Sequence, residues 1–241
     1  MKPFSSIKIS FLIFLVGLFG FLFFSEAIAG TQDNVSGWAW SENIGWISFN
    51  CTNRETCTSS NYGVNIGSST GNFSGYAWSE NIGWINFGPT SDFPGEPSHG
   101  ANLDFSSQEI SGWARACTVF QNKDVCSGAL DPNRGNWDGW IKLGGAIQST
   151  NERYVLRIDA TQNPKEFLGW AWGSNDTSSK AVIGWVSFNH ENCSTPKPGC
   201  PVGTIPVYKV TTTVPINNPK VEIEGKWDNG SWTTGSRTIL P

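Results

Sequence analysis

The sequence predicts an all-β protein made of four tandem three-stranded antiparallel units. Three observations support this. The 241 residues include 27 Gly and 13 Trp, a composition that disfavours helix and suits strands and turns. An aromatic sequence, first seen as "SGWAWSENIGWISFN", recurs along the chain, and such self-similarity is typical of repeat folds. A short stretch with strand-like alternation accompanies each copy.

The aromatic sequence occurs in four copies. The first is "VSGWAWSENIGWISFN" (35–50) and the second is "FSGYAWSENIGWINFG" (73–88). The third is split into "ISGWARAC" (110–117) and "WDGWIKLGG" (137–145), and the fourth is "FLGWAWGSNDTSSKAVIGWVSFN" (167–189). In copies three and four the extra residues fall where copies one and two read "SENIG". Because insertions are tolerated where a chain turns at the surface, "SENIG" is predicted to be a hairpin turn. Asn43 or Gly45 can supply its positive φ.

The hairpin register follows from placing Trp40 opposite Trp46, with Trp38 then facing Ser48. In three copies this sets a glycine opposite a phenylalanine, whose ring can cover the bare backbone. Copy three departs, because Arg115 takes the place of Trp40 and Leu143 that of Phe49; Arg115 can form a cation–π pair with Trp140. The residues assigned to the repeat are Gly37, Trp40, Trp46, Phe49, Gly75, Trp78, Trp84, Phe87, Gly112, Arg115, Trp140, Leu143, Gly169, Trp172, Trp185 and Phe188.

The third strand of each unit is expected to precede its hairpin. Copies two, three and four have "YGVNI" (62–66), "ANLDF" (101–105) and "YVLRI" (154–158). Copy one has no such stretch before it, but "VYKVTT" (207–212) follows copy four. We hypothesise that this C-terminal strand completes the first unit and closes a ring.

Both faces of the hairpins carry apolar side chains, Trp on one and Ala, Ile and Phe on the other. Burial on two sides favours units packed between neighbours, as in a propeller, a solenoid or a sandwich. The strand Trp residues are accordingly expected in the core rather than on a sugar-stacking surface.

Three regions are expected along the chain. Residues 1–29 combine two lysines, an apolar run and "SEAIAG", which is typical of a secretory signal; an uncleaved membrane anchor is the alternative. Residues 30–210 form the repeat domain. Residues 211–241 read as a linker and a β-hairpin, which either packs on the repeat domain or begins a truncated immunoglobulin-like domain that it resembles.

Six cysteines behind a signal sequence predict disulfides and a secreted or cell-surface location. Each lies near one other cysteine, so local pairing is expected. The pairs are Cys51 with Cys57, Cys117 with Cys126, and Cys193 with Cys200. Their spacing does not match a zinc site, and no metal or cofactor is expected.

The candidate binding residues lie in the insertion of copy three, "ALDPNRGNWDG". A ligand surface more often uses loop aromatics than strand ones, which selects Trp137 together with Arg134, Asn136 and Asp138. The oxygen-bearing side chains here also suggest calcium, but the pattern of a calcium loop is absent, and an acidic turn is preferred.

Catalytic motifs are missing from the sequence. No nucleophile elbow, phosphate loop or metal-binding helix motif occurs, so an enzyme is not expected. The net charge of −4 is spread without a basic cluster, so nucleic acid is not an expected partner. Membrane contact is expected only through an uncleaved signal segment.

The sequence "GWAWSENIGWISF" resembles the GWxWSxNIGWIxF repeat of exported or cell-surface proteins from small-genome uncultivated bacteria. That resemblance implies no activity and no functional residues. With the composition it favours a non-catalytic surface or extracellular module for adhesion, display or envelope structure, whose partner is a cell-surface glycan or protein. A carbohydrate-binding module that uses loop aromatics and a secreted enzyme with an unrecognised site are the alternatives.

Overall fold

A computed structural model of the chain describes most of the residues after the predicted signal segment. The described residues are 30, 32–135, 137–146, 151, 153–174, 181–193, 200–201, 203, 206–216, 220–228 and 231–239. Two sequence predictions, the signal segment 1–29 and the candidate Asn136, lie outside them.

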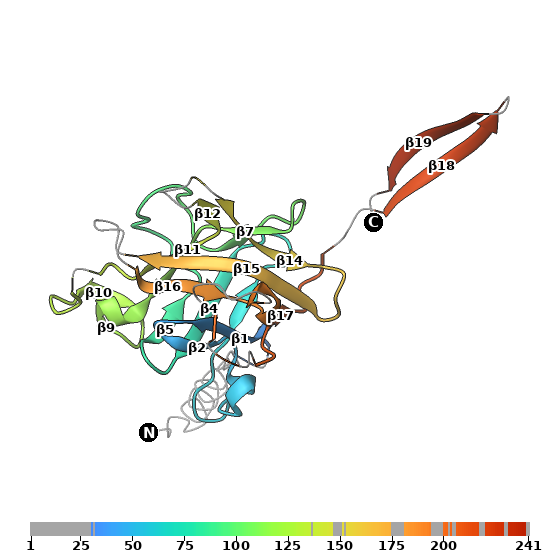
Figure 1. The fold of residues 1–241 in the computed structure, drawn as a ribbon. Helices are drawn as coiled ribbons and strands as arrows, with labels where there is room; N and C mark the ends of the chain where they lie inside the picture. Colours follow the sequence, from blue (N-terminus) through green and yellow to red (C-terminus); the bar gives the residue numbers. More distant parts are fainter. Residues whose placement is uncertain are drawn as a thin grey trace, which may run out of the picture.

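Eight antiparallel strands form a closed barrel (Figure 1). In the order in which they pair around it, they are β11 (Trp140–Leu143), β8 (Trp113–Ala116), β5 (Gly83–Asn86), β4 (Phe73–Ser79), β2 (Gly45–Ser48), β1 (Val35–Ser41), β16 (Ala181–Ser187) and β15 (Lys165–Ser174). The pairing of β15 with β11 closes the ring. The protein is thus all-β as predicted, but the units form a barrel and not a propeller, a solenoid or a sandwich.

Outer strands extend one end of the barrel. They are β3 (Val64–Ile66), β6 (Asn102–Leu103), β7 (Glu109–Ser111), β14 (Leu156–Asp159) and β17 (Val210–Thr212). The strand β17 pairs with both β1 and β15, bringing Val210 opposite Gly37. The hypothesis that a C-terminal strand completes the first unit is therefore consistent with the observed pairing, but the barrel strands close the ring without β17, because β1 pairs directly with β16 and β15 with β11.

Three further strand pairs and three short 3-10 helices complete the described structure. The pairs are β9 (Phe120–Asn122) with β10 (Ser127–Leu130), β12 (Gly145–Ala146) with β13 (Arg153–Tyr154), and β18 (Lys220–Asp228) with β19 (Ser231–Ile239). The 3-10 helices are η1 (Cys51–Arg54), η2 (Cys117–Val119) and η3 (His190–Cys193). Each helix contains one cysteine of a local disulfide, and the three disulfides join the pairs expected from the sequence.

The hairpin register is the one derived from the sequence. Trp40 lies opposite Trp46 and Trp38 opposite Ser48. The turn between β1 and β2 obtains its positive φ from Gly45, at 69°, and not from Asn43. The second, third and fourth hairpins repeat the register.

A glycine marks the point where each long strand changes partners. Residues 35–37 of β1 pair with outer strands, whereas residues from Trp38 onward pair within the barrel. At this point Gly37 has a φ of 92°, and a Cβ there would lie 2.1 Å from the carbonyl oxygen of Lys209. Close backbone approach and positive φ therefore require glycine. The predicted cover by the ring of Phe49 is not the reason, since the atoms nearest that Cβ belong to Lys209 and Val210.

The same geometry recurs at the other repeat glycines, Gly75, Gly112 and Gly169. Each has a φ between 84° and 108°, and a Cβ on each would lie within 2.1 Å of a backbone oxygen of an outer segment. In each case the glycine carbonyl accepts a hydrogen bond from the residue at the Phe49 position, at 2.9–3.3 Å.

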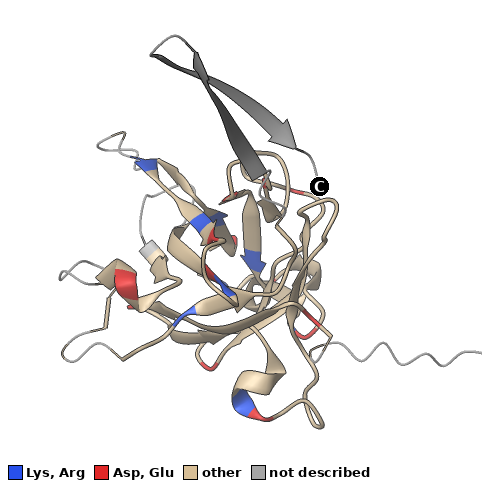
Figure 2. Ribbon diagram, turned by 90° about the vertical axis from the view of Figure 1, so that its right-hand side faces the viewer, with Lys and Arg blue, Asp and Glu red and all other residues tan. Residues whose placement is uncertain are grey.

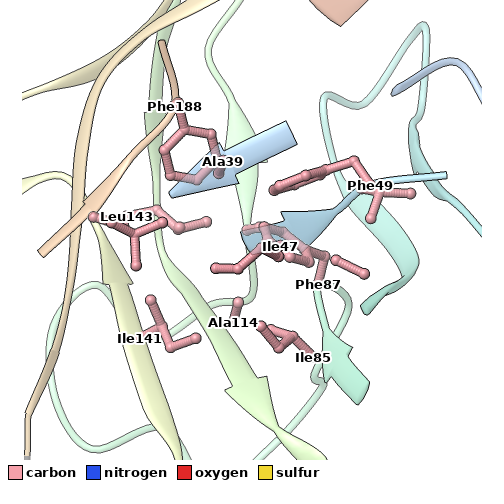
Figure 3. Packing of buried hydrophobic residues seen from close by; sticks show 14 of the residues in the cluster. Ala39, Ile47, Phe49, Ile85, Phe87, Ala114, Ile141, Leu143 and Phe188 are labelled. Carbon is pink, nitrogen blue, oxygen red and sulfur yellow. The ribbon is translucent and has the colours of Figure 1, made fainter. Parts of the chain in front are cut away.

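The barrel interior is filled by pairs of small and large side chains (Figure 3). Ala39 and its cross-strand partner Ile47 both point inward, as expected for an eight-stranded barrel just wide enough for side chains. The inward positions shared by the four hairpins are Ala39, Ala77, Ala114 and Ala171; Ile47, Ile85, Ile141 and Val186; and Phe49, Phe87, Leu143 and Phe188. All of these side chains are buried, so one continuous core holds the hairpins together.

Candidate functional site

The outer face of the barrel carries the tryptophans that the sequence places in the core. Trp38, Trp40 and Trp46 are only half-buried, whereas their neighbours Ala39 and Ile47 are fully buried. The rings of Trp40 and Trp46 lie 4.7 Å apart, edge to face. The expectation of core tryptophans is therefore wrong for this hairpin: alternation along the strands turns Ala and Ile inward and Trp outward.

Equivalent aromatic clusters lie on the second and fourth hairpins. Their half-buried rings are Tyr76, Trp78 and Trp84, and Trp170, Trp172 and Trp185. Within each cluster the rings meet at centroid distances of 4.5–6.4 Å. Edge-to-face aromatic contacts contribute about 0.5–1.5 kcal/mol each beyond the burial of area. The clusters therefore stabilise the hairpins and also present aromatic edges to solvent.

Tyrosines that precede the outer strands complete these clusters, and the sequence reasoning missed them. Tyr208 lies 5.3 Å from Trp46, and its hydroxyl donates to Ser187 Oγ at 2.8 Å. Tyr62 makes the equivalent contacts: its ring lies 5.2 Å from that of Trp84, and its hydroxyl donates to Ser48 Oγ at 2.8 Å. The signal was available in the recurrence of Tyr at the start of three of the four third-strand stretches.

Burial raises the pKa of Tyr62, Tyr154 and Tyr208 above the ordinary value of 10.0, and the effect is largest for Tyr154. For Tyr62 and Tyr208 a hydrogen bond to serine partly offsets it. Tyr154 packs against Trp185, with ring centroids 5.1 Å apart.

We expect the protein to lose stability above about pH 10 because the unfolded chain then releases tyrosine protons that the folded chain retains. The stabilisation is complete below the unfolded pKa and is lost as pH rises through the folded one. Denaturant unfolding at pH 8 and pH 11 measures the loss, and Tyr154→Phe should reduce it. An equal loss in this variant would contradict the assignment to Tyr154.

The third hairpin breaks the pattern with Arg115, which stands where the other hairpins have Trp. Its guanidinium lies 4.3 Å from the ring of Trp140 and 4.7 Å from that of Phe120, so the predicted cation–π pair is present. Its Nε donates to the carbonyl oxygen of Asp138 at 3.0 Å. Burial lowers the pKa of this arginine, and the charges of Asp138 and Asp92 oppose the shift.

A second cation lies on the same outward face. Lys142 stands where two of the other hairpins have Ser48 and Ser187 and the remaining one has Asn86. Its Nζ lies 5.2 Å from the ring of Trp113, its cross-strand neighbour. We call Trp113, Arg115, Trp140 and Lys142 the cationic face.

The predicted loop residues are only partly suited to binding. Trp137 is 6% exposed and packs in the core, so its ring is not available to stack on a ligand. Arg134 is half-buried and its Nη1 donates to the carbonyl oxygen of Asp131 at 3.1 Å. The carboxylate of Asp138 accepts a hydrogen bond from the Trp140 amide at 3.3 Å, which holds the start of β11. On the adjoining cationic face, Trp113 and Lys142 are half-buried, whereas Arg115 and Trp140 are buried.

Among the described residues, no group of three or more His, Cys, Asp or Glu side chains is placed to hold a metal ion. The carboxylate of Asp131, from the calcium hypothesis, accepts from the amide of Asn133 and pairs with Lys123. Glu80 pairs with Arg54, and the ring of His190 lies against the carbonyl of Tyr208.

Charged side chains are sparse and scattered over the ribbon (Figure 2). In the described part of the chain, no helix has the length and apolar character needed to cross a membrane. Three disulfides are typical of proteins from oxidising compartments. Comparisons with protein-family models, with curated proteins and with solved structures give no match.

Proposed function

We propose that this chain is a non-catalytic, exported repeat module that serves adhesion, display or envelope structure at the cell surface. The observation that carries the proposal is the barrel itself. Its interior is packed with side chains from all four hairpins, whereas its outer face presents half-buried aromatic rings. Such a body suits the presentation of a surface better than the enclosure of a substrate.

The module is further proposed to be a fourfold repeat in which β17 supplies the outer strand of the first unit. Equivalent hydrogen bonds at the strand junctions support this organisation. The amides of Trp38, Tyr76 and Trp170 each donate to a carbonyl of an outer segment, at 2.9, 2.8 and 3.1 Å. A repeat built this way needs all of its units to bury its core.

Expression of the full chain in a bacterial host tests the export proposal. We expect intact cells to expose the protein to added protease or to release it, with all six cysteines oxidised. Mass measurement before and after thiol labelling reads the disulfides, and a Cys51→Ser/Cys57→Ser variant serves as the labelling control. Retention in the cytoplasm with free thiols would contradict the proposal.

A carbohydrate-binding module remains the second candidate, now on different residues. The half-buried rings of Trp38, Trp46 and Tyr208 on the outer face favour it, because aromatic edges and faces suit the apolar side of a sugar ring. Trp137, in contrast, is buried.

A further inference from the structure

We propose that the cationic face is a binding site for an acidic carbohydrate, with Arg115 as the residue that receives its carboxylate. The proposal deepens the surface-module function and rests on it. Its starting point is the break in the fourfold pattern, which places two cations on one outward face where the other hairpins have neutral residues.

The guanidinium of Arg115 is preorganised for a planar anion. The rings of Trp140 and Phe120, at 4.3 and 4.7 Å, hold it, and the Nε bond to Asp138 fixes its orientation. Among the described residues its Nη atoms have no hydrogen-bond partner and it forms no ion pair. An arginine with a free edge binds a carboxylate through two parallel hydrogen bonds, and its burial of about nine-tenths strengthens such bonds.

Lys142 supplies a second charge on the same face, diagonally across the β8–β11 pair from Arg115. Its Nζ lies over the ring of Trp113, and it belongs to no ion pair in the described part of the chain. The carboxylates of Asp92 and Asp138 also act on Arg115, so an incoming anion competes with them. Because the anion is held by charge–charge attraction, which salt screens, its affinity is expected to fall as the salt concentration rises.

A sugar fits this site better than an acidic peptide because an aromatic ring lies beside the cations. The ring of Trp113 is half-buried, and its Nε1 donates to the carbonyl oxygen of Pro97 at 2.8 Å, which fixes its plane. Trp113 lies two residues from Arg115 on the same face of β8. A sugar can contact the exposed part of this half-buried indole beside Lys142 while its carboxylate reaches the guanidinium.

Calorimetric titration of the full chain tests the proposal with a glucuronate-containing oligosaccharide and with its carboxyl-reduced, neutral counterpart. We expect the acidic sugar to bind at least about tenfold more tightly than the neutral one, since charge-assisted hydrogen bonds are lost on reduction. Arg115→Trp should abolish this preference. The variant restores the residue that the other three hairpins carry, so the fold accommodates it, and a thermal melt checks that it does.

Two further measurements make the outcome decisive. Lys142→Ser, which copies Ser48 and Ser187, should weaken acidic-sugar binding and leave neutral-sugar binding unchanged. Equal affinity for the two sugars, or a preference that survives Arg115→Trp, would overturn the site, while any sugar binding that remained would leave the module function standing. Tighter binding of a glutamate peptide than of the acidic sugar would also overturn the ligand class. Conversion of the sugar to a new product would instead contradict the non-catalytic function.

Discussion

Replacing Gly169 with alanine is expected to destabilise the barrel by about 3 kcal/mol or more. Gly169 has a φ of 108°, and a Cβ there would lie 1.8 Å from the carbonyl oxygen of Val155. The new methyl group would strain the backbone and also push apart β14 and β15, which hydrogen-bond at this point. Chemical denaturation of both proteins measures the difference.

Two other glycines distinguish the cost of the positive φ from the cost of the close contact with Val155. Gly95 has open space around its missing side chain and no positive φ, so Gly95→Ala should change stability by less than about 0.5 kcal/mol. Gly203 has a φ of 90° but also open space, so Gly203→Ala isolates the backbone cost at about 1–2 kcal/mol. A Gly169→Ala protein no less stable than Gly203→Ala would show that the close approach at Val155 is relieved without cost.

The second large effect is expected at Phe49, whose truncation to alanine should cost about 3–5 kcal/mol. Its ring is fully buried and lies 5.1 Å from that of Phe87 and 5.6 Å from that of Phe188. Alanine would leave a cavity where three hairpins meet, and the surrounding strands, closed into a ring, have little freedom to collapse into it.

The third hairpin offers the matched control for this prediction. It carries Leu143 at the Phe49 position, also fully buried, so Phe49→Leu should cost less than about 1.5 kcal/mol. Urea unfolding of both variants gives the two values. If alanine and leucine cost the same, the interior must repack more freely than the closed barrel suggests.

Local structure was predictable from this sequence to an unusual extent because repeats allow copies to be compared. The insertions in copies three and four identified the turns, and with them the register of Trp40 and Trp46. The pairing of a C-terminal strand with the first hairpin, too, followed from a stretch missing before copy one and present after copy four. These are comparisons of the chain with itself, so they need no knowledge of packing.

Which face of each hairpin points into the barrel could not be predicted by comparing the copies. One hairpin face carries Trp and the other carries Ala, Ile and Phe, and both are apolar. Hydrophobicity alone assigns Trp to the core, but an eight-stranded barrel is too narrow to hold so many indole rings. Ala39 opposite Ile47 fits that interior, and Trp40 opposite Trp46 does not.

The residues of the proposed binding site were also only partly predictable. Reasoning from loops selected Trp137, which instead fills the core, because a loop aromatic in sequence can still be buried by the fold. Arg115 was noticed as a departure from the repeat, and Lys142 was not. The two become a single surface feature only when the pairing of β8 with β11 sets Trp113 beside Lys142 and Arg115 beside Trp140.

The position of β17 has a mechanical consequence. Its last residue, Thr212, lies opposite the first residue of β1, Val35, and the amide of Thr213 donates to the carbonyl of Asn34 at 3.0 Å. The chain thus enters and leaves the barrel at one point. A pulling force applied at both ends of this segment would unzip β1 from β17 one hydrogen bond at a time. It would not load all of their hydrogen bonds at once, as in shear. Unfolding under load would therefore begin at this junction and release β17 before it disturbs the pairing of β1 with β16 in the barrel.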